Sequence, residues 1–232
     1  MFPVLCLSCG KEGSWLCEEC SSQTKLLDFQ VCPVCEDIIT EKGRLCSACR
    51  ASQKSSLDSL LAAVSYENPS IKHLVHNLKY RFASSIAEPL AMLLVKALVR
   101  SDFSVPDCII PVPLHPRRLR WRGFNQSLLL AEHIAEELTP LLKIEVLDIL
   151  SRARFNQPQM KIKNYQERLQ NVKDIFTFRP DTDPSLIKNK SILLVDDIAT
   201  TGATLEECAK VLKSAGAKKV FAAVVARQSV KK

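Results

Sequence analysis

The stretch ILLVDDIATTGATL, residues 192–205, limits the fold of this chain more than any other segment. Its first four residues are all apolar, which is typical of a parallel strand that is covered on both faces. Two aspartates follow, and then a loop of small and hydroxyl-bearing residues with one glycine. We predict a strand over 191–195 that ends at Asp196 and Asp197, and a helix that begins near residues 202–204.

The rest of the chain from Leu57 onward alternates between strand-like and helical patterns. Short apolar runs predict strands over 61–66, 107–113 and 219–226. Apolar residues at helical spacing predict helices around 71–78, 87–94, 131–138 and 205–212. Strands that alternate with helices in this way indicate an α/β fold, with a parallel sheet flanked by helices.

Ten cysteines are present, and all but Cys108 and Cys208 lie in four Cys-x-x-Cys pairs within the first 49 residues. Four thiolates fill one tetrahedral zinc site, so the pairs predict two structural zinc ions. Sequential pairing (first with second, third with fourth) is the simpler topology, and cross-braced pairing stays open. We expect a double zinc ribbon over residues 1–52 and a second domain over 53–232. The expected ligands are Cys6, Cys9, Cys17, Cys20, Cys32, Cys35, Cys46 and Cys49.

The composition argues against a membrane or secreted protein. No apolar run approaches the ~20 residues of a membrane span, and the first residues lack the regions of a signal peptide. We therefore expect a cytoplasmic protein without membrane insertion. The net charge of +7 is concentrated in HPRRLRWRG (115–123) and in residues 150–173. Such clusters are either solvated surface or sites for phosphates, on a small molecule or on nucleic acid.

The loop after the predicted strand suits a phosphate monoester. Ligands of parallel sheets collect at the carboxyl ends of strands, and the start of a helix binds anions. Hydroxyls and small residues are expected to form the phosphate site: Thr200, Thr201, Gly202, Ala203 and Thr204. The carboxylates of Asp196 and Asp197 would repel phosphate and instead suit a vicinal diol, a divalent cation or both. Together these groups describe a site for ribose 5-phosphate. A Walker loop is excluded, because no Gly-Lys-Ser/Thr follows, and the absence of G-x-G-x-x-G argues against a dinucleotide fold.

The segment ILLVDDIATTGAT resembles the signature of type I phosphoribosyltransferases. The chain as a whole resembles one subgroup, the ComF/GntX family of competence-associated proteins. The matching segments are the cysteine pairs, LKYRF (78–82), IIPVPLHPRRLRWRGFNQSLLLA (109–131), LSRARFNQPQ (150–159) and ERLQNVKDIF (167–176). The resemblance implies a type I phosphoribosyltransferase fold with a small zinc-ribbon domain at the N-terminus.

The resemblance also implies roles for individual residues. Asp196 and Asp197 would hold the ribose hydroxyls of phosphoribosyl pyrophosphate (PRPP), directly or through Mg²⁺. Residues 200–204 would bind the 5-phosphate, the flap 150–173 would cover the site, and residues 57–82 would contribute to a hood. The turn 113–118 would bind pyrophosphate, and its expected contacts are Pro113, Arg117 and Arg118. For catalysis we expect Asp196, Asp197 and Arg122; Arg120 is a further candidate, and His115 is either a proton donor or a packing residue.

Two functions stay open. The main expectation is a phosphoribosyltransferase-like protein that binds PRPP or ribose 5-phosphate with Mg²⁺ and serves natural competence. In that role it would handle incoming single-stranded DNA beside a helicase partner. The alternative is an active PRPP-dependent phosphoribosyltransferase with an unknown small acceptor and no DNA role. Thr200 stands where purine-salvage enzymes carry an aspartate base, but threonine also occurs in active orotate-type enzymes, so it does not decide between the two.

Overall fold

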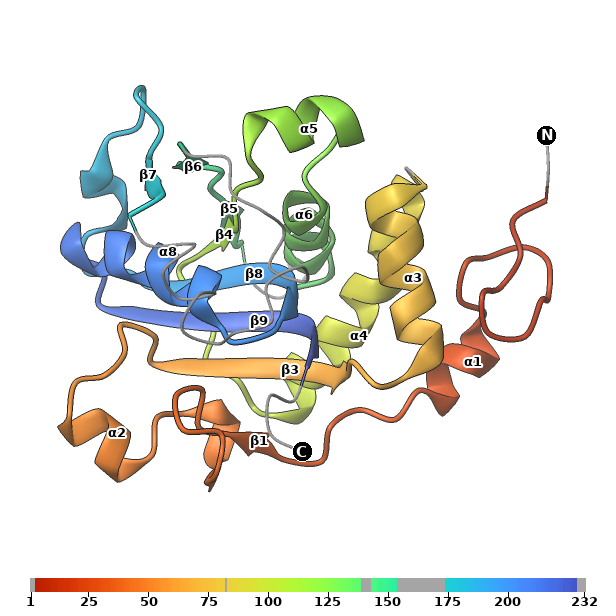
Figure 1. Cartoon of the computed structure of the whole chain (residues 1–232), viewed down its shortest axis with the longest axis horizontal. Helices are drawn as coiled ribbons and strands as arrows, with labels where there is room; N and C mark the ends of the chain where they lie inside the picture. The colour runs from red at the N-terminus through yellow and green to blue at the C-terminus, as the bar shows by residue number, and fades with distance from the viewer. Residues whose placement is uncertain (1–2, 82, 139–142, 154–173, 229–232) are drawn as a thin grey trace.

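The computed structural model describes residues 3–81, 83–138, 143–153 and 174–228. Within them, five parallel strands form a sheet in the order β3-β9-β8-β4-β5 (Figure 1). An antiparallel pair lies beside this sheet. The bounds are β3 (Ser59–Ser65), β4 (Cys108–Pro111), β5 (Glu145–Val146), β6 (Leu150–Arg152), β7 (Phe176–Phe178), β8 (Ser191–Ala199) and β9 (Lys219–Arg227). The predicted α/β class and parallel sheet are confirmed.

Helices cover both faces of the sheet. One core contains α3 (Pro69–Tyr80), α4 (Ala87–Arg100) and α6 (Gln126–Leu138), and the other contains α8 (Ala203–Ser214). The shorter elements are β1 (Gln30–Val31), β2 (Ile39–Thr40), α1 (Glu18–Gln23), α2 (Ser47–Ala51), α5 (Pro116–Arg122), η1 (Glu41–Gly43), η2 (Ser84–Ile86) and η4 (Pro184–Ile187). In the part of the chain that the structure describes, no helix combines the length and the apolar character that a bilayer span requires.

The side chains of β8 explain its uninterrupted apolar run. Leu193 and Val195 belong to the core on the α4 and α6 side, whereas Ile192 and Leu194 belong to the core under α8. All four are fully buried. A central parallel strand needs apolar residues at every position because both of its faces are covered.

The end of β8 differs from the prediction. The strand continues to Ala199 because β9 extends beside it to Arg227, and the ladder includes Asp196. The predicted end of the strand at the aspartates is therefore wrong on the side of β8 that pairs with β9. On the other edge, β4 ends at Pro111, opposite Val195. Asp196 and Asp197 thus lie beyond the end of β4, while Asp196 and Ile198 still pair with β9, and this step in the sheet positions the candidate site.

The cysteine-rich segment packs against two separate parts of the sheet domain. We call residues 3–26 the first cysteine module and residues 27–52 the second cysteine module. In the first, the indole N–H of Trp15 donates to Ser85 at 2.8 Å, and Leu16 joins the core with α3 and α4. In the second, the side-chain amide of Gln30 both donates to and accepts from the backbone of Ala62, each at 3.0 Å. These contacts cross the predicted boundary at residue 52, which itself stays a prediction.

Gly43 is a point of very close approach between the second cysteine module and β3. It has φ of +66°, and a Cβ there would lie 2.0 Å from the carbonyl oxygen of Leu60. We expect Gly43→Ala to lower the free energy of unfolding, because the added methyl overpacks the contact. The loss should be about 1–3 kcal/mol larger than the loss from Gly→Ala at a left-handed glycine with open space around it. The matched control is Gly10→Ala, at φ of +79° with open space around it. Equal losses for the two variants in urea unfolding would contradict this expectation.

Candidate functional site

Two buried aspartates stand at the end of β8. Asp196 accepts hydrogen bonds from the hydroxyl of Ser127 and from the backbone N–H of Asp197, both at 2.8 Å. Asp197 lies 2.7 Å from the ammonium of Lys79, measured from Oδ2 to Nζ. Burial and the neighbouring carboxylate of Asp197 raise the pKa of Asp196 to about 7. The pair is therefore rich in acceptor oxygens, and Lys79 compensates its negative charge only in part.

Three arginines line the same pocket: Arg118, Arg122 and Arg152. Arg122 and Arg152 are buried, and the Nε atom of each has no hydrogen-bond partner. Burial lowers the pKa of all three, and that of Arg152 reaches about 10, with Arg118 contributing. All three remain charged at neutral pH. A cluster of desolvated guanidinium groups in one pocket suits a phosphate or pyrophosphate.

The turn after β4 is held by side-chain hydrogen bonds. The amide of Asn125 donates to the backbone carbonyl of Val112 at 3.1 Å. His115 caps the start of α5, where its Nδ1 accepts from the backbone N–H of Arg117 at 3.1 Å. Burial and the surrounding arginines, of which Arg152 contributes most, lower the pKa of His115. A neutral capping histidine fits the packing role better than the proton-donor role.

The loop between β8 and α8 has the features of an anion site. Gly202 is the N-cap of α8 with φ of +72°, a conformation that glycine adopts without strain. Its Cβ position is open, so an anion can approach the backbone. The side chains of Thr200 and Thr204 line the pocket. The hydroxyl of Thr201 instead accepts from the backbone N–H of Ala203 at 3.4 Å, which shapes the loop from within.

These parts enclose one pocket of about 890 Å³, counting space that is open to solvent. Acidic side chains, basic side chains and residues at the start of α8 all line it. One class of ligands fits this combination: compounds that carry both hydroxyls and phosphates.

Comparisons with known proteins agree with this geometry. The family described as "Phosphoribosyl transferase domain" matches residues 125–232. The "DNA utilization protein YhgH" of Escherichia coli K12 is 31% identical over 93% of this chain and 93% of its own length. The "Competence protein ComFC" of Streptococcus pneumoniae is 31% identical over 90% of this chain and 86% of its own length. The "Competence protein F" of Haemophilus influenzae is 29% identical over 94% of this chain and 95% of its own length.

The chain belongs to the competence protein F family. The resemblance inferred from the motifs is thereby confirmed, and so is the phosphoribosyltransferase fold with its cysteine-rich N-terminal segment. This ComF-family chain is phosphoribosyltransferase-like in its sheet domain.

The structure brings together only some of the residues that the sequence singled out. Those that line the pocket are Pro113, Arg118, Arg122, Asp196, Asp197, Thr200 and Thr204. The others lie next to it: Arg117 and Arg120 are exposed on α5, and Thr201, Gly202 and Ala203 form the loop behind the lining threonines. The predicted flap extends over 150–173, of which residues 154–173 lie outside the described residues.

Three residues that line the pocket were not singled out individually from the sequence: Lys79, Tyr80 and Arg152. Lys79 and Tyr80 come from the end of α3, within the LKYRF match, and Arg152 comes from β6, within LSRARF. The sequence placed them only within the broader hood 57–82 and flap 150–173. Their distance along the chain from Asp197 explains why no local motif connects them.

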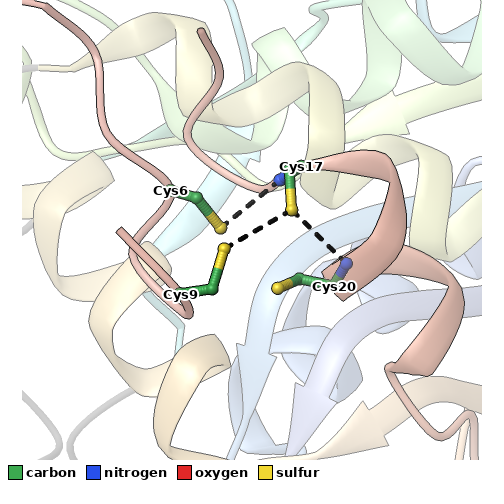
Figure 2. Close-up of side chains that lie close together, drawn as sticks. All are labelled: Cys6, Cys9, Cys17 and Cys20. Atoms are coloured by element: carbon green, nitrogen blue, oxygen red, sulfur yellow. Dashed lines mark hydrogen bonds between the residues drawn. The ribbon is translucent and has the colours of Figure 1, made fainter. Parts of the chain in front are cut away.

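The eight paired cysteines form two clusters, each of which gathers four thiols at one point. Figure 2 shows the first cluster. The first holds Cys6, Cys9, Cys17 and Cys20, and the second holds Cys32, Cys35, Cys46 and Cys49. The Sγ atoms of Cys9 and Cys17 are 3.7 Å apart, close to the ~3.8 Å edge of a tetrahedron with metal–sulfur distances of about 2.3 Å. The thiols form no disulfides. Both clusters pair sequentially, which rules out the cross-braced alternative, and thiolates at every position suit a structural metal.

Proposed function

We propose that this protein binds PRPP or ribose 5-phosphate together with Mg²⁺, and that it serves the handling of transforming single-stranded DNA. One observation carries the first part: carboxylate and guanidinium groups together line a single pocket. Asp196 and Asp197 form the acidic wall, and Arg118, Arg122 and Arg152 form the basic wall. A sugar with neighbouring hydroxyls and phosphates at both ends complements this arrangement.

Each part of such a ligand has matching groups in the pocket. Ribose hydroxyls would donate to the carboxylates of Asp196 and Asp197, which accept hydrogen bonds only. The 5-phosphate would lie at the start of α8, near the hydroxyls of Thr200 and Thr204. The pyrophosphate would lie against the arginines, whose planar guanidinium groups bind paired oxygens.

The acidic wall also fits Mg²⁺, which prefers carboxylate oxygens. The raised pKa of Asp196 reflects acidic charge that burial leaves poorly compensated, and a cation would relieve it. When bound, Mg²⁺ would neutralise charge on the pyrophosphate. The chain itself would hold that anion through Arg122 and Arg152 and would orient the sugar through the aspartates. The two cysteine clusters would each bind one structural zinc ion.

Calorimetry with ribose 5-phosphate and with PRPP, in the presence of Mg²⁺, tests the pocket. We expect heat of binding with both compounds and tighter binding of PRPP, because only PRPP offers a group to the arginines. Heat with neither compound would refute the pocket assignment. A parallel assay for pyrophosphate release against nucleobases separates the two functions, since release would support an active phosphoribosyltransferase with a small acceptor.

The DNA part of the proposal rests on the names of the relatives and on the surface of α5. Trp121 is 56% exposed, and its ring lies 6.1 Å from that of Tyr80. Arg117 and Arg120 are exposed on the same helix. Exposed aromatic rings among arginines are typical of surfaces that bind single strands, where rings stack on bases and guanidinium groups contact phosphates. A competence helicase partner and a cytoplasmic location belong to the same proposal.

We expect Trp121→Ala to weaken the binding of a single-stranded oligonucleotide by about 1–3 kcal/mol, the usual worth of one stacked base. Arg120→Ala should also weaken binding and should lower its dependence on salt, because one phosphate contact is lost. Fluorescence anisotropy over a range of salt concentrations measures both effects. The matched control is Arg100→Ala, since Arg100 is exposed at the end of α4 and paired with Asp28. Unchanged affinity in both α5 variants would remove α5 from the DNA-binding surface.

A further inference from the structure

Lys79 places a positive charge inside the pocket, directly on the acidic wall. Its Nζ is 2.7 Å from Oδ2 of Asp197, and the two side chains are only 17% and 4% exposed. The charge of Lys79 also acts on Asp196, whose pKa it lowers against the larger effect of burial. Lys79 belongs neither to the cysteine clusters nor to the phosphate loop, so the roles assigned to those features do not explain its position.

The fold holds Lys79 in that position. Asn68 caps the start of α3, and the buried face of the helix includes Leu74 and Leu78. Lys79 follows Leu78 in the last turn, so the anchored helix end directs it at the pocket. The next residue, Tyr80, packs against the guanidinium of Arg122 at 5.9 Å from its ring. The end of α3 therefore lies between the acidic wall and the basic wall.

A metal ion and this ammonium compete for the same acceptor. Mg²⁺ binds carboxylate oxygens at about 2.0–2.1 Å, whereas Oδ2 of Asp197 is already in ion-pair contact with Lys79. Two cations on one buried carboxylate would repel each other strongly, because screening is weak away from water. A divalent cation can bind there only after the ammonium has moved.

We propose that Lys79 is the internal cation of this pocket, which neutralises the acidic pair until a divalent metal displaces it. The proposal rests on the proposed function, because it takes Asp196 and Asp197 as the metal-binding pair. It adds that Lys79 sets how strongly ligand binding depends on metal. A lysine displaced from Asp197 carries its charge on a flexible four-carbon chain, so it can turn to the anionic part of the ligand.

The test is Lys79→Met, which keeps the length of the side chain and removes its charge. We expect the variant to bind Mn²⁺, used alone as the probe, at least about tenfold more tightly, because the metal no longer displaces an ammonium. We expect its binding of ribose 5-phosphate in metal-free buffer to become weaker, because the acidic pair is then uncompensated near an anion. Calorimetry measures both, and the opposite signs distinguish this role from a general loss of structure.

Matched variants complete the experiment. Lys72→Met lies on the same helix, where Lys72 pairs with Glu67 at the surface, and should leave both affinities unchanged. Lys79→Arg keeps the charge and should bind Mn²⁺ as the unmodified protein does. Circular dichroism and metal content verify that each variant is folded. Equal or weaker Mn²⁺ binding by folded Lys79→Met would overturn the proposal. If neither the unmodified protein nor any variant binds a sugar phosphate, but Lys79→Met still gains Mn²⁺ affinity, the proposed function fails and the role of Lys79 stands.

Discussion

Replacing Asp196 and Asp197 together by asparagine is expected to reduce PRPP affinity at least about 100-fold. Each carboxylate would accept a charge-assisted hydrogen bond from a ribose hydroxyl, and such bonds contribute about 1.5–3 kcal/mol each. Asparagine keeps a neutral acceptor, worth about 0.5–1.5 kcal/mol, so the two exchanges cost about 2–3 kcal/mol. Every 1.4 kcal/mol is a factor of ten in affinity. The loss of the Mg²⁺ ligands adds to the effect. Calorimetry in Mg²⁺-containing buffer measures it.

The double variant should still fold. The amide oxygen of an asparagine can accept from the hydroxyl of Ser127 as Asp196 does now. Removing both charges also ends the repulsion that raises the pKa of Asp196. The control is Asp181→Asn, at an exposed position that does not line the pocket. If the double variant keeps its melting temperature and still binds PRPP as tightly as the control, the acidic wall is not the sugar site.

Loss of a single cysteine ligand is the second change with a large expected effect. Cys32→Ser and Cys6→Ser should each reduce the zinc content from two ions per chain to one, because each removes one of the four thiolates in one cluster. Structural zinc sites contribute about 10–16 kcal/mol of apparent binding free energy in isolated zinc-finger peptides. A small module gains little free energy from burying apolar surface. Losing even a fraction of the zinc-binding free energy should therefore lower the melting temperature sharply. Elemental analysis and thermal unfolding measure both results.

The other two cysteines provide the control. Cys108 lies on β4 and Cys208 on α8, both fully buried and outside the two clusters. Alanine at either position should keep two zinc ions and cost only a small loss of packing. Two zinc ions in Cys32→Ser, or fewer than two in Cys108→Ala, would contradict the assignment of ligands.

Features carried by a local pattern could be predicted from the sequence. The apolar run of β8 has to be buried on both faces, and the four cysteine pairs lead to two clusters. The threonine-rich loop could be predicted for the same reason, since a strand, an acidic pair and the start of a helix are contiguous in it. Arg118 and Arg122 lie four positions apart on α5, and both face the pocket. The sequence did not show which face of α5 points to the pocket. It therefore did not predict that Arg117 and Arg120 lie outside the pocket lining.

Features that depend on distant segments could not be predicted. The length of β8 is set by how far β9 extends beside it, and β9 begins 20 residues after β8 ends. The contact of Lys79 with Asp197 joins the end of α3 to the end of β8, and only the tertiary packing of α3 brings them together. Arg152 reaches the pocket from β6, outside the main sheet. No periodicity in the chain encodes these distances.

The contact of Gln30 with Ala62 has a consequence for solubility. β3 is a long apolar strand at the edge of the sheet, and unpaired backbone groups on such an edge are templates for association between molecules. The amide of Gln30 occupies these groups in the manner of a neighbouring strand. Gln30 is held in place by the second cysteine module, which we propose is stabilised by zinc. Chelation should therefore yield aggregates joined through β3.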